Sequence, residues 1–346
     1  MRTCLALLAL VALACAPPDP RPGRGEGPPA HRPADGLLSD TVLQRVVEQG
    51  LARDTEGLLL ALHDPRPRVR ARAAFALGSV QDPEALEGLI ALLRDGHPGV
   101  RADAAFAVGQ TEGEGLGSTL FDAFKVEWVP EVRQAQLHAM ARRCDQTAAR
   151  RLRSVEVVGI QATLTRTLAR CALDGFGGEE GWAFLAGRLS HEDPEIREWA
   201  AYPFGRSSEP EVWARELEAV RKALDAADPR DPAAMHLVRA LGRAGDRESI
   251  PRLAWWLRRA RLWPIRANAA EALGALDGPD RYAPLLEALA DPSVHVRVQA
   301  AEALASSPPD QDVARAARAR LQEHPEDTAP AGALLEILAG QGDAGT

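Results

Sequence analysis

Apolar positions recur along most of the chain with the spacing of one helix face. Val69, Ala73, Ala76 and Leu77 stand at i, i+4, i+7 and i+8, and the same spacing returns from Val100, 31 residues later. Because an α-helix turns once in 3.6 residues, these positions fall on one side of it. The pattern therefore predicts a series of helices that each bury one face.

These helices form an internal repeat, V-R-x-x-A-x-x-A-L-G in its fullest form. Nine copies fit the pattern, and their final positions are 31 to 37 residues apart. After each copy a short polar turn leads to a second apolar helix, for which the clearest ranges are 83–94, 180–189, 249–261 and 281–290. Such helix pairs cannot bury their apolar faces alone, so we expect them to stack into one continuous core.

Small residues within the repeat predict how neighbouring helices meet. The two alanine columns should let an adjacent helix approach closely, and we interpret the final glycine as a left-handed helix C-cap. One spacing of 37 residues marks an irregular repeat, whose second helix, 211–227, is longer and more charged than the others.

The motif D-x4-V-R-x-x-A-x-x-A-L-G resembles the HEAT-repeat family, particularly its short bacterial, phycobilisome-lyase-like form. The resemblance runs from Ser39 to Ala339. It implies an all-α fold, a right-handed α–α superhelix of about nine to ten helix pairs over residues 39–340, followed by a flexible tail, 341–346. It also implies that the second helix of each pair lines the concave side.

In this family the arginine column and the acidic residues before the next helix form a ladder between repeats. We therefore assign these side chains a structural role and no ligand. The arginines of the column are Arg70, Arg101, Arg133, Arg166, Arg197, Arg266 and Arg297. The acidic positions are Asp64, Asp95, Glu127, Asp228 and Asp291.

The N-terminus, MRTCLALLALVALAC, resembles a bacterial lipoprotein signal peptide. Arg2 supplies a positive charge, residues 5–13 are apolar, and small Ala14 precedes Cys15. The apolar stretch is shorter than a membrane-spanning helix requires. The resemblance implies that residues 1–14 are removed and that Cys15 is acylated; an ordinary secretory signal with an incidental cysteine is the alternative. The chain departs from the usual pattern at Ala12, where the family commonly has leucine.

Residues 15–38 are expected to form a tether between the membrane and the repeats. Seven prolines and three glycines fall between Ala16 and Ala34, a composition typical of an extended linker. We expect the protein to lie in the cell envelope, anchored by lipid. Because alanine rather than aspartate follows Cys15, the resemblance implies an outer-membrane position facing the periplasm in a host with two membranes.

Composition narrows the class of partner. The chain carries 41 basic and 49 acidic residues, a net charge of −8, whereas nucleic-acid binding domains usually present a basic stripe. We therefore expect no nucleic acid among the partners.

An oxidising compartment would permit a disulfide between Cys144 and Cys171. Two unpaired cysteines buried on helices are the alternative, and the one that we favour.

No catalytic or metal-binding motif is apparent. The histidines occur singly, no cysteine pair has zinc spacing, and no glycine-rich phosphate loop follows a strand. His191 and Glu192 form the one His-Glu pair and are assigned to a solvated turn. We expect no catalytic residue, no metal and no cofactor.

One patch on the helix 249–261 is a candidate partner site. At 100° per residue, Trp255 and Arg259 lie opposite the apolar stripe, with Arg252 beside them. Exposed tryptophan and arginine are enriched at binding hot spots. Trp213 and Trp182, on preceding second helices, could extend the patch. The alternative is that Trp255 packs against a neighbouring helix.

The sequence thus predicts a monomeric, membrane-tethered scaffold that binds a protein or peptide partner through the solenoid surface. The alternative is a lyase-like catalytic or accessory protein that binds a small molecule in a concave groove. Fold resemblance does not carry that activity across.

Overall fold

The computed structural model describes residues 40–307 and 310–342. These ranges contain helices and connecting turns and no strand, so the predicted all-α fold class is confirmed. None of the helices within them is both long enough and apolar enough to cross a membrane. The predicted signal peptide and tether, residues 1–38, and positions 343–346 of the predicted tail lie outside the described residues.

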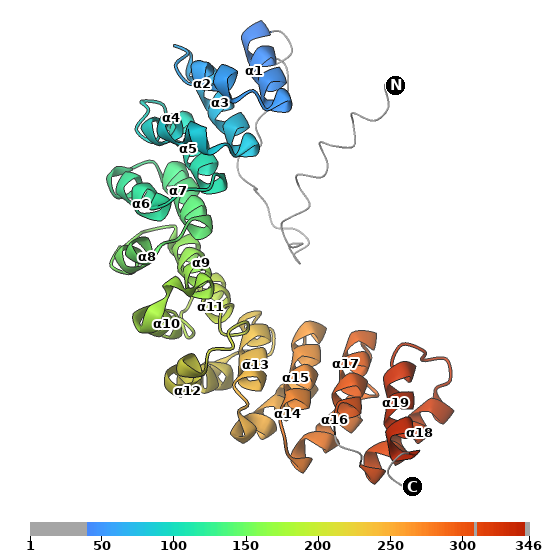
Figure 1. The fold of residues 1–346 in the computed structure, drawn as a ribbon. Coiled ribbons are helices and arrows are strands. Elements are labelled where there is room, and N and C mark those ends of the chain that lie inside the picture. Colours follow the sequence, from blue (N-terminus) through green and yellow to red (C-terminus); the bar gives the residue numbers. More distant parts are fainter. Residues whose placement is uncertain (1–39, 308–309, 343–346) are drawn as a thin grey trace, which may run out of the picture. The chain divides into compact units, whose positions relative to one another are not determined.

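The helices that carry the repeat motif form one layer, in which each packs against the next (Figure 1). Most begin with a proline in the first turn, where its missing N–H costs no hydrogen bond. The layer consists of α3 (Pro67–Val80), α5 (Pro98–Gln110), α7 (Pro130–Arg142), α9 (Gln161–Cys171), α11 (Pro194–Ala201), α13 (Ala233–Arg243), α15 (Trp263–Ala275), α17 (Val294–Ala305) and α19 (Ala331–Gly342).

The second helices of the pairs form the other layer. They are α2 (Thr55–Ala61), α4 (Leu86–Leu92), α6 (Leu116–Val126), α8 (Gln146–Arg153), α10 (Gly178–Ala186), α12 (Pro210–Ala226), α14 (Ile250–Arg259), α16 (Tyr282–Ala288) and α18 (Gln311–Glu323). Helix α1 (Thr41–Ala52) precedes the first pair. Several are shorter than predicted because their first turn is a 3-10 turn, as at η2 (Pro83–Ala85), η4 (Arg247–Ser249) and η5 (Pro279–Arg281).

The motif columns form the core between the layers. Val69, Ala73 and Leu77 are fully or almost fully buried, as are most of their counterparts in later repeats; Leu173 and Leu338 are partly exposed. The long second helix predicted for the irregular repeat is present as α12, with 17 residues. Just before this repeat, the chain leaves α9 through a π-helical turn, η3 (Ala172–Phe176).

The glycines at the motif end are not left-handed C-caps, so that interpretation was wrong. Gly78, Gly109 and Gly242 lie inside their helices, whereas the left-handed cap of α3 is Gln81, with φ 60°. A Cβ added to any of these glycines would lie 2.7 to 3.0 Å from the Cα of an alanine in the next motif helix. Glycine is needed there because two helix backbones touch.

Cys144 and Cys171 form a disulfide, which corrects the preference for unpaired cysteines. Cys171 ends α9, but Cys144 lies in the turn between α7 and α8 rather than on a helix. Stacking brings this turn beside the end of α9, with the two Cα atoms 5.5 Å apart, a normal separation for a disulfide. Both residues are buried, as expected.

Candidate functional site

Five of the seven arginines in the motif column join successive repeats. Arg70, for example, donates from Nε and Nη2 to the carboxylate of Asp95 at 2.8 and 2.9 Å. Its Nη1 also donates to the carbonyl oxygen of Asp64. The equivalent pairs are Arg101–Glu127, Arg197–Asp231, Arg266–Asp291 and Arg297–Asp327. These side chains are occupied in holding repeats together.

Three details of the ladder differ from the prediction. The partner of Arg197 is Asp231, not the nearby Asp228, and Arg297 pairs with Asp327, which motif spacing did not single out. Asp64 pairs locally, with Arg66 at 2.9 Å. Turn length varies between repeats, so a fixed offset finds the correct acidic residue only where the turns are alike.

Arg133 and Arg166, also predicted for the ladder, stack on aromatic rings instead. Arg133 lies 4.5 Å from the ring centre of Phe124, and Arg166 lies 4.6 Å from that of Trp199. In the regular repeats the acidic partner lies about 26 residues after the arginine. At that distance Arg133 is followed by Gly159, and Arg166 is followed by Glu192, in turns of different length. Glu192 is itself acidic, so a missing carboxylate accounts for Arg133 alone; both guanidinium groups gain from the electron-rich face of an aromatic ring.

The predicted patch on α14 is exposed in part. Trp255 is 46% exposed and Arg259 is exposed, on the face opposite buried Leu253 and Leu257. Arg252 is less available, because its guanidinium forms an ion pair with Asp225 at 2.5 Å. The free part of the patch is therefore the indole of Trp255 and the end of Arg259.

Trp182 and Trp213 do not extend this surface, which corrects the second part of the prediction. They are only 5% and 8% exposed. Both pack against Phe204, with ring centres 5.1 and 6.4 Å apart. A tryptophan whose sequence neighbours are polar can still be buried when the next repeat covers it. Helix periodicity within one repeat does not show such burial.

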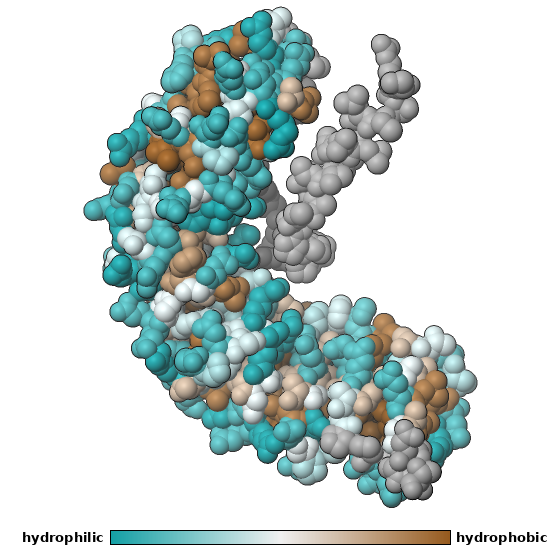
Figure 2. All heavy atoms as spheres, in the orientation of Figure 1, coloured by the Kyte–Doolittle hydropathy of each residue, from teal (hydrophilic) through white to brown (hydrophobic). Residues whose placement is uncertain are grey.

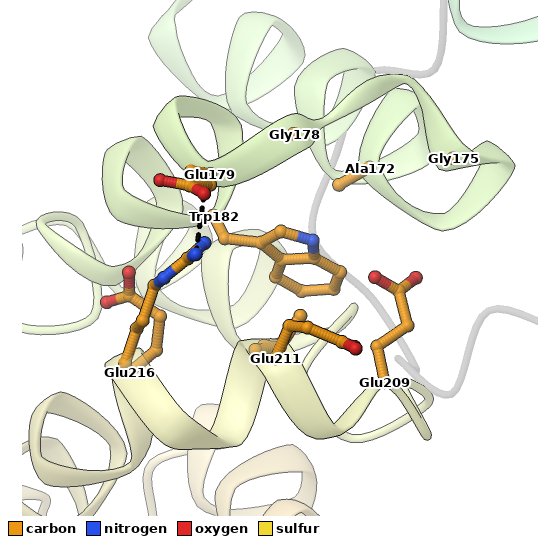
Figure 3. A pocket seen from close by; sticks show the side chains of 10 residues that line it. Ala172, Gly175, Gly178, Glu179, Trp182, Glu209, Glu211 and Glu216 are labelled. Carbon is orange, nitrogen blue, oxygen red and sulfur yellow. Dashed lines mark ion pairs between the residues drawn. The ribbon is translucent and has the colours of Figure 1, made fainter.

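Trp182 instead forms a wall of a cavity between α10 and α12, shown in Figure 3. The cavity has a volume of about 320 Å³ and was not predicted from the sequence. Four glutamates line it: Glu179, Glu209, Glu211 and Glu216. These glutamates come from α10 and from the N-cap and first half of α12, which belong to successive repeats. No motif within one repeat can therefore reveal them.

One cation of the chain also lies in this cavity. Arg215 pairs with Glu179 at 2.5 Å, drawn as the dashed line in Figure 3. Burial raises the pKa of the Glu216 carboxyl above its ordinary value, and the neighbouring charge of Arg215 opposes this only in part. Four carboxyl groups and one guanidinium therefore line the cavity, and the raised pKa of Glu216 favours the neutral form of that one carboxyl.

The described residues contain no group of three His, Cys, Asp or Glu side chains placed to hold a metal ion. His191, of the single His-Glu pair, accepts a hydrogen bond from the backbone N–H of Asp193 through Nδ1. It thus stabilises the turn before α11.

The stacked helix pairs define the class of protein. The family model for HEAT repeats matches residues 55–154, 217–305 and 257–338, and the chain belongs to the HEAT-repeat family. No curated protein sequence matches the chain.

Several solved structures share the fold. An engineered protein is 18% identical, with a TM-score of 0.52 over 86% of this chain and 90% of that one. Yeast importin-β is 15% identical, with a TM-score of 0.55 over 87% of this chain and 48% of importin-β. A chain in a homology model of the full-length AP-3 complex is 10% identical, with a TM-score of 0.62 over 84% of this chain and 58% of its own length. This chain thus spans about half the length of the two natural proteins.

Proposed function

We propose that this protein is a non-catalytic, monomeric scaffold that binds a protein or peptide partner through its solenoid surface. The observation that carries the proposal is the half-exposed indole of Trp255 beside exposed Arg259 on α14. A large aromatic side chain left in water on a rigid helix gains free energy when a partner covers it. Figure 2 shows apolar patches among polar ones on the face in view.

The test is partner capture from crosslinked envelope fractions. Replacing Trp255 and Arg259 by alanine should abolish capture while leaving helicity and melting temperature unchanged, because neither side chain belongs to the core. Trp128→Ala is the matched control, since Trp128 is 82% exposed in a different repeat. Undiminished capture by the double variant would refute this site.

The repeat motif supports assigning the array to the short bacterial, phycobilisome-lyase-like form of the family. The likeness concerns a scaffold, and an activity resides in a site rather than in a fold. We therefore propose no lyase activity, no cofactor and no nucleic-acid partner.

We further propose that the protein is exported and anchored through lipid on Cys15, facing the periplasm in a host with two membranes. The signal-like N-terminal sequence supports this, and so does the Cys144–Cys171 disulfide, because such bonds persist mainly in oxidising compartments. Cys15→Ala should move the protein from the membrane to the soluble fraction. Cys4→Ala, a cysteine within the segment to be removed, is the control; membrane retention of Cys15→Ala would contradict the anchor.

A further inference from the structure

A strip of arginine and aromatic side chains crosses three successive motif helices, α9, α11 and α13, which pack side by side (Figure 1). Arg166 of α9 lies over the ring of Trp199 in α11, 4.6 Å from the ring centre. The ring of Tyr202 lies 5.7 Å from that of Trp199, and Arg206 lies over Tyr202 at 4.8 Å. The contacts continue to α13, where the ring of His236 lies 5.3 Å from that of Tyr202. We call these five side chains the arginine–aromatic strip.

The two arginines of the strip differ from those of the ladder, because their hydrogen-bond donors are free. Both Arg166 and Arg206 are exposed. Within the described residues neither of them forms an ion pair or donates a hydrogen bond. A guanidinium that lies over a ring keeps its N–H groups in its own plane, where a carboxylate can accept two of them side by side. The rings also restrain the guanidinium groups, which lowers the entropy that ordering them on a partner would cost.

The pKa values of two histidines reflect the positive charge along the strip. Burial, together with the charges of Arg239 and Arg206, lowers the pKa of His236 to about 4. Burial and the charges of Arg166 and of a second arginine likewise lower the pKa of His138 on α7. Positive charge therefore extends from α7 to α13 on this layer.

The carboxylates near the strip are already engaged. Asp174 pairs with Arg170 at 3.3 Å, and Glu271 pairs with Arg239 at 3.6 Å. Glu198 of α11 also has a partner of its own. An anionic ligand would therefore meet guanidinium groups that no carboxylate has claimed, although the chain as a whole carries a charge of −8.

We propose that the arginine–aromatic strip binds an acidic peptide segment of a partner protein, with one carboxylate held by Arg166 and another by Arg206. This rests on the proposed function and goes beyond it, because it names a second surface, on the motif layer rather than on α14, and the chemistry of its partner. Trp199 and Tyr202 serve as platforms for the two arginines. A nucleic acid carries a charge on every unit and would be repelled by the overall charge of the chain, whereas a few carboxylates of a peptide can be confined to the strip.

Fluorescence anisotropy of a labelled acidic peptide, titrated with the full chain, tests the proposal. The probe is fluoresceinyl-Glu-Gly-Glu-Gly-Glu-amide, and its control is the same peptide with glutamine in place of glutamate. We expect saturable binding of the glutamate peptide and about tenfold weaker binding of the glutamine peptide. A labelled oligothymidylate of the same number of units should also bind about tenfold more weakly than the glutamate peptide.

Variants test the arginines and their platform separately. Arg166→Gln and Arg206→Gln should each raise the Kd of the glutamate peptide about fivefold, the effect of losing one exposed ion pair. Arg318→Gln, at an exposed position of α18 in the other layer, makes the same charge change and should leave the Kd unchanged. Trp199→Leu should also raise the Kd, whereas Trp199→Phe should keep it near the native value, because a phenyl ring still supports a guanidinium. Circular dichroism at 222 nm checks that each variant keeps its helicity.

Four results would overturn the proposal. They are the absence of saturable binding, equal binding of the two peptides, binding of oligothymidylate as tight as that of the glutamate peptide, and an unchanged Kd in both arginine variants. An effect of Arg318→Gln as large as theirs would equally show that the charge of the whole chain, rather than the strip, attracts the peptide.

The double variant of Trp255 and Arg259 separates this proposal from the preceding one, since it should bind the glutamate peptide with the native Kd. If partner capture depends on Trp255 while the Kd ignores the strip variants, the strip proposal alone is overturned. If the Kd depends on the strip but capture does not depend on Trp255, the strip proposal stands and the α14 site is overturned.

Discussion

Replacing Gly242 by alanine tests whether the helix backbones of successive repeats are in direct contact. Gly242 is buried inside α13, next to Ala272 of α15. In an isolated helix the substitution should stabilise, because alanine has the higher helix propensity, by about 1 kcal/mol. In this fold we expect the opposite sign.

The expected size follows from the distances. A Cβ on Gly242 would lie 2.7 Å from the Cα and 2.8 Å from the Cβ of Ala272, whereas ordinary contact begins at 3.4 Å. The two helices would have to separate by about 0.7 Å, and no rotamer change can relieve a clash with backbone. Overpacking of this kind costs about 1 to 3 kcal/mol. Subtracting the propensity gain of about 1 kcal/mol leaves a net loss of about 0 to 2 kcal/mol.

Urea denaturation followed by circular dichroism at 222 nm measures the change in unfolding free energy. Gly340→Ala in α19 is the matched control, because a Cβ there meets no atom within 4 Å. It should leave stability unchanged or raise it by about 0.5 kcal/mol. If Gly242→Ala proved as stable as the native protein or more so, the close approach of α13 and α15 would not be the reason for this glycine.

Three further predictions concern the core and the ladder. Reducing the disulfide, or replacing Cys144 and Cys171 by serine, should cost about 3 to 4 kcal/mol of unfolding free energy, because 27 residues separate them; an unchanged urea midpoint would contradict a bond in the native protein. Gln136→Met should stabilise by about 1 kcal/mol, since both polar atoms of this fully buried amide lack a partner among the described residues; a lower melting temperature would show that the amide is satisfied. Hydrogen bonding from Arg297 lowers the pKa of Asp327 below its ordinary 3.8. The ion pair therefore stabilises the fold above pH 3.8, and this stabilisation is lost as the pH falls through the folded pKa. Arg297→Met should flatten the fall in unfolding free energy between about pH 5 and pH 2, and an identical pH profile would exclude this pair as a cause.

The repeated elements could be predicted because their information is local. The Val-Ala-Ala-Leu columns lie on one helix face whatever the neighbour is, so the motif helices, the second helices and the long α12 all follow from periodicity. The ion pairs of the ladder could be predicted in part, because their spacing is also regular where the turns are alike. It holds at Arg70, where the turns are regular, and changes at Arg133, where the following turn carries no acidic residue at the expected place.

The surface features were less predictable because they depend on what the next repeat covers. Trp255 is partly exposed as its helical face indicates, but Trp182 is buried by Phe204 and by α12. The glutamates of the cavity lie about 30 residues apart on two helices. No pattern within one repeat relates them.

The sequence by itself determined that this chain forms helix pairs, how many motif helices there are, and which face each of them buries. These properties depend on intervals of a few residues within one helix. Only the tertiary structure decided that the motif glycines serve close packing, that Cys144 meets Cys171, and that α10 and α12 line an open acidic cavity. Each of these depends on the distance between atoms in different helices, which the packing of neighbouring repeats sets.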